Sequence, residues 1–378
     1  MKRNGLIVPA FAALTLAFAS FGDAFLYPFL PVNGLAVGIP LAWVGVLLSI
    51  NRFVRILSNG LMVHTFSRYG LRDVMIAAAL LAILSTAGYA FASGILLWLI
   101  LRIVWGLSFS ALRLGTLAYA LQHPKQGTAL GVSRGLQEAG PMLALFAVPV
   151  FIQALPPTYI FIGLSLLSLP ALYFSLSLPN RKVNVETSRY NLSLRWPSTL
   201  NAITLLSAIL VDGIFVVALG ILFLHGRNIS LIAATSLAAF YLGYRRICLV
   251  ILSPVGGWIA DKIGFETVFT ATLALVIAGL ILVASGWIAP GAIVIFTFYG
   301  IQSAITPGNV SKAQSSLVAV AENATWRDIG AAVGTLAGGF LIGSAYLSPA
   351  LSIGTFVLII LALVHFKTRW KEFSFAWK

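Results

Sequence analysis

The chain has 378 residues, of which 60% are hydrophobic and 9% are charged, and its mean hydropathy is +0.98. Soluble domains carry about 25% charged residues, so this composition excludes a soluble globular protein and indicates an integral membrane protein. Apolar runs of about 20 residues recur from end to end and leave no room for a sizeable soluble domain. The single cysteine, Cys248, excludes a disulfide framework and a cysteine metal site.

The first apolar run covers residues 6–30. It can be a signal peptide with a basic start or an uncleaved first span, and its continuation past Asp23 favours the span. In chain order, the predicted spans fall near residues 6–30, 38–63, 73–93, 95–121, 128–153, 157–178, 199–224, 230–259, 266–287, 289–311, 325–345 and 348–366. These twelve spans form two sets of six. We therefore predict an all-α polytopic membrane protein with a six-helix bundle over residues 1–178, a polar linker over 179–198 and a second six-helix bundle over 199–378 that ends in a short basic tail.

The distribution of lysine and arginine predicts the orientation, because these residues are retained on the cytoplasmic side of short loops. With a cytoplasmic N-terminus, the outer loops hold one basic residue, Arg227, and the inner segments hold sixteen: Lys2, Arg3, Arg68, Arg72, Lys125, Arg181, Lys182, Arg189, Arg195, Lys262, Lys312, Arg327, Lys367, Arg369, Lys371 and Lys378. Both termini are then cytoplasmic. The net charge of +14 is mostly topological and indicates no nucleic-acid partner. We expect a monomer that crosses the plasma membrane many times, which is the inner membrane in a bacterium.

The loop between the eighth and ninth spans contains GGWIADKIGFE, in which Gly257, Asp261, Lys262 and Gly264 are spaced as in a tight helix reversal. The loop between the second and third spans, VHTFSRYGLR, repeats part of this pattern with Arg68, Gly70 and Arg72. Residues 51–72 and 245–266 align without a gap, which is a weak internal repeat. The pattern resembles the signature loop of the major facilitator superfamily, whose members are built from duplicated six-helix halves.

Two further segments carry the same resemblance. LRIVWGLSFSALR in the fourth span has Arg102 followed by Gly106, similar to the superfamily's fourth-helix motif. GLQEAGP in the fifth span has Gly140 and Pro141, similar to the fifth helix of proton-exchanging exporters. The resemblance implies a substrate cavity at mid-membrane between two bundles, which opens alternately to each side as the halves rock.

Charged residues within the predicted spans are the candidates for function. An arginine at the bilayer centre costs roughly 2.5 to 3.5 kcal/mol, so these residues cannot all face lipid. The basic ones are Arg52, Arg55, Arg102, Arg113, Arg134, Arg245 and Arg246, and the acidic ones are Asp23, Glu138 and Asp212. Residues predicted to bind substrate in the cavity are Arg52, Arg55, Arg245, Arg246, Tyr27, Tyr241 and Gln302.

The carboxylates suggest how transport is coupled. Asp23 and Asp212 are candidates to take up and release a proton, although each can instead neutralise an arginine. Arg134 and Glu138 are four residues apart and can pair within their helix. Arg102 is expected near the outer end of its span, where it can reach the membrane interface or fasten two helices. We assign Asp23, Asp212, Glu138, Arg102 and Arg134 to proton coupling.

The signature loops are predicted to control the cytoplasmic side. The resemblance implies that Asp261 holds this side closed, and we expect its contact near the start of the eleventh helix, at Trp326, Arg327 and Asp328. A solvated turn residue is the alternative. The residues assigned to this gating function are Arg68, Gly70, Arg72, Gly257, Asp261, Lys262 and Gly264.

Three functions are compatible with these features. The first is a secondary transporter that exports a small organic compound by proton exchange. The second, in the same fold, is an importer or exchanger of an organic anion such as a carboxylate or phosphate ester, favoured by seven basic against three acidic residues within spans. The third is a polytopic membrane enzyme or a lipid-handling protein. The sequence has no phosphate-binding loop, metal-ligand histidine pair or nucleophile elbow, so we expect no enzyme activity, no catalytic residue, no cofactor and no metal.

Overall fold

A computed structural model describes residues 5–182, 196–227, 231–314, 317–341 and 344–376, and the secondary structure of these residues is helical, without strands. The first half of the chain forms α1 (Ile7–Ala19), α2 (Phe21–Asn33), the short 3₁₀-helix η1 (Leu35–Val37), α3 (Leu41–Tyr69), α4 (Leu71–Gly88), α5 (Gly94–Leu121), α6 (Gln126–Ala154), α7 (Pro157–Leu167) and α8 (Pro170–Leu176). The second half forms α9 (Thr199–Ser207), the π-helical segment η2 (Ala208–Phe215), α10 (Val216–Arg227), α11 (Leu231–Ile263), α12 (Phe265–Ala284), α13 (Ile288–Gln314), α14 (Leu317–Leu341) and α15 (Leu347–Ala376).

Each of the twelve predicted spans coincides with one helix or with a broken series of helices. Within the described residues, nine helices are long and apolar enough to cross a membrane, or ten when the bent pair α1 and α2 is taken as one span. The two remaining helices, α6 and α14, contain the charged residues Arg134, Glu138, Arg327 and Asp328. The number of twelve crossings therefore stays a prediction, as does the cytoplasmic position of both termini.

Three of the spans are interrupted, each for an identifiable reason. The chain bends by 46° between α1 and α2 at Ser20, whose hydroxyl donates to the Leu16 carbonyl oxygen at 2.7 Å. Pro170 begins α8, since proline cannot donate the hydrogen bond that would continue α7. In the seventh span, η2 has π-helical geometry around Asp212. Such geometry is rare in proteins, and where it occurs it is often at a functional site.

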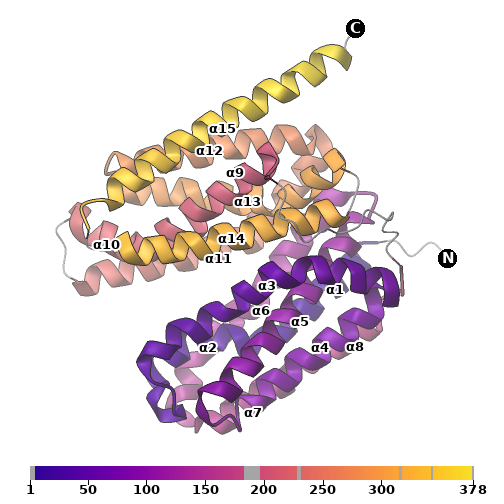
Figure 1. The fold of residues 1–378 in the computed structure, drawn as a ribbon, viewed down its shortest axis with the longest axis vertical. Coiled ribbons are helices and arrows are strands. Elements are labelled where there is room, and N and C mark those ends of the chain that lie inside the picture. The colour runs from indigo at the N-terminus through magenta and orange to yellow at the C-terminus, as the bar shows by residue number, and fades with distance from the viewer. Residues whose placement is uncertain (1–4, 183–195, 228–230, 315–316, 342–343, 377–378) are drawn as a thin grey trace.

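Helices α1–α8 lie together and helices α9–α15 lie together, and we call these two sets the N-terminal half and the C-terminal half (Figure 1). The domain boundaries predicted at residues 178 and 199 stay a prediction, because most of the linker lies outside the described residues. The C-terminal half has one apolar core and the N-terminal half has two, and one of these two shares residues with the other half. Ala321 and Ala324 of α14 join the core of the N-terminal half, and Ala129 and Leu130 of α6 join that of the C-terminal half.

The halves converge toward the end of the molecule at which the N-terminus lies (Figure 1). This is the end that the sequence predicts to be cytoplasmic, and we call it the inner end. The two signature loops lie here as tight reversals, in which Gly70 has φ +90° and Gly264 has φ +96°. Positive φ values of this kind favour glycine, so the prediction of glycine-dependent turns is confirmed at both loops.

Candidate functional site

The two most extensive contacts between the halves are those of α6 with α11 and of α3 with α14, and α13 makes a smaller contact with α6. The side-chain bonds between the halves extend from the inner end to beyond the middle of α3 and α14. On α3 they begin at Arg52 and on α14 they extend as far as Thr335. We call the contact of α6 with α11 and that of α3 with α14 the two seams, and we describe the predicted functional residues by their position relative to them.

The α6–α11 seam is a close approach of two backbones. A Cβ atom added to Gly127 would lie 2.2 Å from the carbonyl oxygen of Gly257, and one added to Gly131 would lie 2.2 Å from that of Ser253. A Cβ on Gly135 would lie 2.7 Å from the Val250 oxygen. These separations are shorter than any real contact, so Gly127, Gly131 and Gly135 at four-residue spacing allow the helices to touch. We call this contact the glycine seam.

Asp261 closes the inner end of the glycine seam. Its Oδ1 accepts a hydrogen bond from the Gly127 N–H at 2.7 Å, and its Oδ2 accepts from the Thr128 N–H and hydroxyl, both at 2.7 Å. These donors lie at the start of α6, where backbone N–H groups have no partner within the helix and attract a carboxylate. The expectation of a helix N-terminus was right, but its identity was wrong: Asp261 contacts the fifth span and not the eleventh.

The α3–α14 seam is made by side chains. Arg52 donates to the Ala331 carbonyl oxygen at 3.2 Å and to Thr335 Oγ1 at 2.8 Å. Asn59 donates to Thr325 Oγ1 at 3.2 Å. Arg52 has no carboxylate partner among the described residues. We call this contact the polar seam.

Between the two seams the structure gathers most of the intramembrane charge, which we call the central charge cluster. Its members come from both halves, from α3, α5, α6, η2, α11 and α14. They are Arg55, Arg113, Arg134, Glu138, Asp212, Arg245, Arg246, Arg327 and Asp328. Six arginines and three carboxylates give a formal charge of 6 − 3 = +3.

Asp328 links the halves on the α3 side of the cluster. Its Oδ1 lies 3.4 Å from Arg55 Nη2 and 3.1 Å from Arg113 Nη1, both from the N-terminal half, and Asn59 lies 3.4 Å from its Oδ2. The sequence placed Arg327 and Asp328 at the cytoplasmic start of the eleventh span. This was wrong, because α14 begins at Leu317 and both residues lie about three turns inside it.

Glu138 links the halves on the α11 side. Arg134, one turn before it on α6, places its guanidinium 2.9 Å from Glu138 Oε1, which confirms the predicted pair within the helix. The other oxygen, Oε2, accepts from Arg246 of α11. Glu138 thus has one partner in each half.

Asp212 is the carboxylate of the C-terminal half. It pairs with Arg245 and with Arg327, whose Nη2 lies 3.3 Å from Oδ2, and it accepts the Tyr299 hydroxyl at 2.8 Å. Arg245 and Arg246 are adjacent on α11, but they point to different carboxylates in different halves. In this state both Asp212 oxygens accept from donors, so the residue acts as a counter-ion.

Asp23 and Arg102 form a separate neutral pair in the N-terminal half. Arg102 donates to Asp23 and, through Nε, to the Leu47 carbonyl oxygen at 2.7 Å, and Asn51 lies 3.5 Å from Asp23. The Arg102 side chain is fully buried, whereas that of Asp23 is 16% exposed. The expectation that Arg102 reaches the membrane interface was wrong. The alternative, in which it fastens two helices, describes its contacts.

The other residues predicted in the cavity differ in their surroundings. Tyr27 is exposed, and Tyr241 is buried against the Phe223 ring. Gln302 is buried, and its Oε1 has no hydrogen-bond partner in the part of the chain that the structure describes. Their binding of substrate stays a prediction.

In the signature loops, the Lys262 Nζ lies 3.6 Å from the ring centre of Trp258, and the Arg68 guanidinium lies over the ring of Tyr69. The buried Nε of Arg72 has no hydrogen-bond partner among the residues that the structure describes. A role of these loop residues in gating also stays a prediction.

Sequence reasoning missed two features of the site. The four-residue glycine spacing of residues 127–135 was a readable signal, since small residues at this spacing let membrane helices approach closely. Recognising Asp328 as a counter-ion within the membrane required knowing where α14 begins. The polar residues 322–328 hide the start of this helix in a hydropathy pattern. Within the described residues, no group of histidine, cysteine, aspartate and glutamate could hold a metal ion.

A comparison with models of known protein families identifies the family of this chain. The model of the Major Facilitator Superfamily matches residues 12–325. The chain belongs to the Major Facilitator Superfamily. It is therefore a multi-pass membrane transporter and not an enzyme. No curated protein sequence matches the chain.

Solved structures of Major Facilitator Superfamily transporters share this fold. The human organic anion transporter MFSD10 (TETRAN) is 16% identical with a TM-score of 0.76, covering 94% of this chain and 98% of that protein. The transporter FucP in the outward conformation is 15% identical with a TM-score of 0.68, covering 95% and 99%. A bacterial homologue of the iron transporter ferroportin in the outward-facing state is 12% identical with a TM-score of 0.67, covering 96% and 99%.

Proposed function

We propose that the chain is a secondary transporter that moves a small organic anion across the membrane by alternating access. The observation that carries this proposal is the net charge of +3 in the central charge cluster. Arginines within a membrane protein line a water-filled cavity or pair with acidic groups, and here the acidic groups of the chain are too few. An anionic substrate supplies the missing negative charge.

The contacts of the cluster suggest how such a substrate acts. Asp328 and Glu138 bridge the halves through Arg55, Arg113 and Arg246, so these bonds break when the halves separate at the inner end. Breaking a buried ion pair is costly unless another group takes the place of the lost partner. A carboxylate or phosphate on the substrate fills that place, with Arg52 as a further ligand at the polar seam. The structural similarity to MFSD10, an organic anion transporter, supports the same substrate class.

Counterflow into proteoliposomes tests this function. Vesicles loaded with one organic anion are expected to accumulate the labelled anion, and vesicles without protein are not. Arg52→Gln and Arg246→Gln are expected to reduce uptake strongly, while Arg52→Lys retains charge and part of the activity. A thermal-shift screen of anions and cations against the wild type and Arg52→Gln gives an independent readout. Binding of cations alone would overturn the proposal.

Proton-coupled efflux is a second candidate, supported by the pair of Asp23 and Arg102. The partly exposed carboxylate of Asp23 is an accessible proton acceptor. Its protonation would leave the fully buried Arg102 without a counter-ion. Substrate efflux from vesicles is then expected to follow an imposed pH gradient and to lose this dependence in Asp23→Asn. Equal transport with and without the gradient would favour anion exchange or uniport. We further propose that the transporter acts as a monomer in the plasma membrane.

A further inference from the structure

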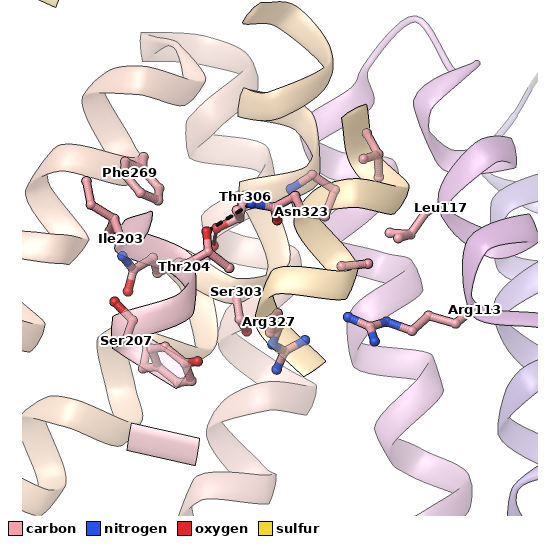
Figure 2. Close-up of a pocket in the computed structure, with 15 residues that line it drawn as sticks. Arg113, Leu117, Ile203, Thr204, Ser207, Phe269, Ser303, Thr306, Asn323 and Arg327 are labelled. Atoms are coloured by element: carbon pink, nitrogen blue, oxygen red, sulfur yellow. Dashed lines mark hydrogen bonds between the residues drawn. The ribbon is translucent and has the colours of Figure 1, made fainter. Parts of the chain in front are cut away.

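A small polar cavity lies beside the central charge cluster, within the C-terminal half. It has a volume of about 40 Å³, and residues of α9, α12, α13 and α14 line it, while Arg113 and Leu117 of α5 close it on the side of the N-terminal half (Figure 2). Nothing in the transport cycle described above uses this space. Its lining is unusual for a cavity inside a membrane protein because it combines two guanidinium groups with hydroxyl and amide groups.

Two polar atoms of the cavity lining have no hydrogen-bond partner. Ser207 Oγ and Gln302 Oε1 are unpaired among the described residues, and both side chains are more than nine-tenths buried. Their neighbours are satisfied: Thr306 donates to the Gln302 carbonyl oxygen, Ser303 to the Gly300 carbonyl oxygen, and Thr204 accepts from Asn323. A buried polar group without a partner costs about 1–3 kcal/mol, so these two atoms indicate something bound.

Two arginines face the cavity from different halves of the protein. The guanidinium group of Arg113 extends from α5 toward that of Arg327 on α14, and both residues line the cavity (Figure 2). Arg113 interacts unfavourably with the charges of Arg327, Arg55 and Arg134. Arg113 and Arg327 each bond one carboxylate, Asp328 and Asp212 respectively, and Asp212 is shared with Arg245. Positive charge at the cavity is therefore only partly neutralised.

The size of the cavity limits what can occupy it. About 40 Å³ admits roughly three water-sized species, since each needs about 10–15 Å³ of such space. An organic anion is too large. Water alone satisfies Ser207 and Gln302 but leaves the positive charge unopposed.

We propose that this cavity binds one small inorganic anion such as chloride between the guanidinium groups of Arg113 and Arg327, with a water molecule linking the anion to Ser207 and Gln302. The anion is resident and is not the transported substrate. Because Arg113 belongs to the N-terminal half and Arg327 to the C-terminal half, the anion stabilises the conformation in which the halves touch at the inner end. The anion occupies a position that the proposed function does not assign to the substrate, and one bound monovalent anion lowers the charge of the central charge cluster from +3 to +2, which still favours an anionic substrate.

Thermal unfolding of the purified protein tests the site. At constant ionic strength, chloride or bromide replaces gluconate, which is too large for the cavity. The unfolding midpoint is expected to rise with halide concentration and to saturate. Arg113→Gln is expected to weaken the apparent halide affinity about 10- to 150-fold, as for a lost hydrogen bond to a charged group, and Ser207→Ala roughly two- to tenfold. Arg113→Lys, which keeps the charge, serves if the glutamine variant does not fold.

Two control variants locate the effect. Ser253→Ala removes another buried hydroxyl without a partner, outside the cavity, and is expected to leave the halide response unchanged. Arg246→Gln removes a charge of the cluster that does not line the cavity, and it too should retain the response. Equal midpoints in halide and gluconate would show that the cavity holds water only. A halide effect that persists in the Ser207 and Arg113 variants, or that disappears in Arg246→Gln, would overturn the assignment to this cavity.

Discussion

The glycine seam and the polar seam join the same two halves by different physical means. In the glycine seam, α6 and α11 touch through backbone atoms, and three glycines leave no room for a side chain between them. In the polar seam, α3 and α14 are joined by directional bonds from Arg52 and Asn59. Close packing of backbones tolerates almost no change in shape, whereas side-chain bonds can be exchanged for bonds to water or to a ligand. We infer that substrate acts first on the polar seam.

Asp328→Asn is expected to have the largest effect on this comparison. Asparagine keeps the shape of the side chain but leaves Arg55 and Arg113 without their carboxylate, and removing one partner of a buried pair costs about 3–5 kcal/mol. The polar seam should open. The measurement is the distance between spin labels at Tyr69 and Ile263, two exposed positions at the inner end, in a Cys248→Ser background.

Glu138→Gln is the matched comparison for this prediction. Its partner Arg246 is 39% exposed and can be hydrated when the carboxylate is lost, so a smaller change is expected than for Asp328→Asn. Equal changes in the two variants would show that the seams do not differ in this respect.

Gly131→Ala tests the glycine seam. The new methyl group would overlap the Ser253 carbonyl oxygen, and overpacking of this kind costs about 1–3 kcal/mol. The inner-closed conformation should be depleted and the label distance should increase. Gly243→Ala on α11 is the control, because a Cβ there meets nothing within 4 Å, and it is expected to behave as the wild type. A seam that accepts the Gly131 methyl group without change would contradict the account of backbone contact.

Asp261→Ala removes the carboxylate at the start of α6. The loss of a side chain that caps a helix N-terminus costs about 0.5–2 kcal/mol, and three hydrogen bonds disappear here. The inner-closed state should be weakened less than in Gly131→Ala. Asp261→Asn keeps one acceptor oxygen and should lie between alanine and the wild type in the same distance measurement.

Thr335→Val is expected to have the smallest effect on the contact between the halves, about 0.5–1.5 kcal/mol, because it removes one bond to the partly exposed Arg52. It also removes the bond of the Thr335 hydroxyl to the Ala331 carbonyl oxygen within α14. Thermal unfolding of the variant is the measurement. Thr355→Val is the control, since its hydroxyl donates to the Leu351 carbonyl oxygen in the same helix. A loss in Thr335→Val no greater than in Thr355→Val would show that the bond between Arg52 and Thr335 does not stabilise the polar seam.

Several features of the site were readable from the sequence because they are local. The glycine turns at Gly70 and Gly264 follow from the φ values that only glycine adopts easily, and the pair of Arg134 and Glu138 follows from the helical repeat. The partners of Asp261, Arg102 and Asp328 were not readable. They lie 134, 79 and 215 residues away in the chain, and a single sequence has no signal for which helices become neighbours.

The sequence by itself determined that this chain is a polytopic helical membrane protein with too many arginines for its carboxylates, because hydropathy, composition and charge are properties of the residues alone. The tertiary structure decided which arginine meets which carboxylate, and that one seam is closed by backbones and the other by side chains. The physical reason is that ion pairs and close packing act over a few ångströms. Only the assembled halves bring α3 to α14 and α6 to α11 at that distance.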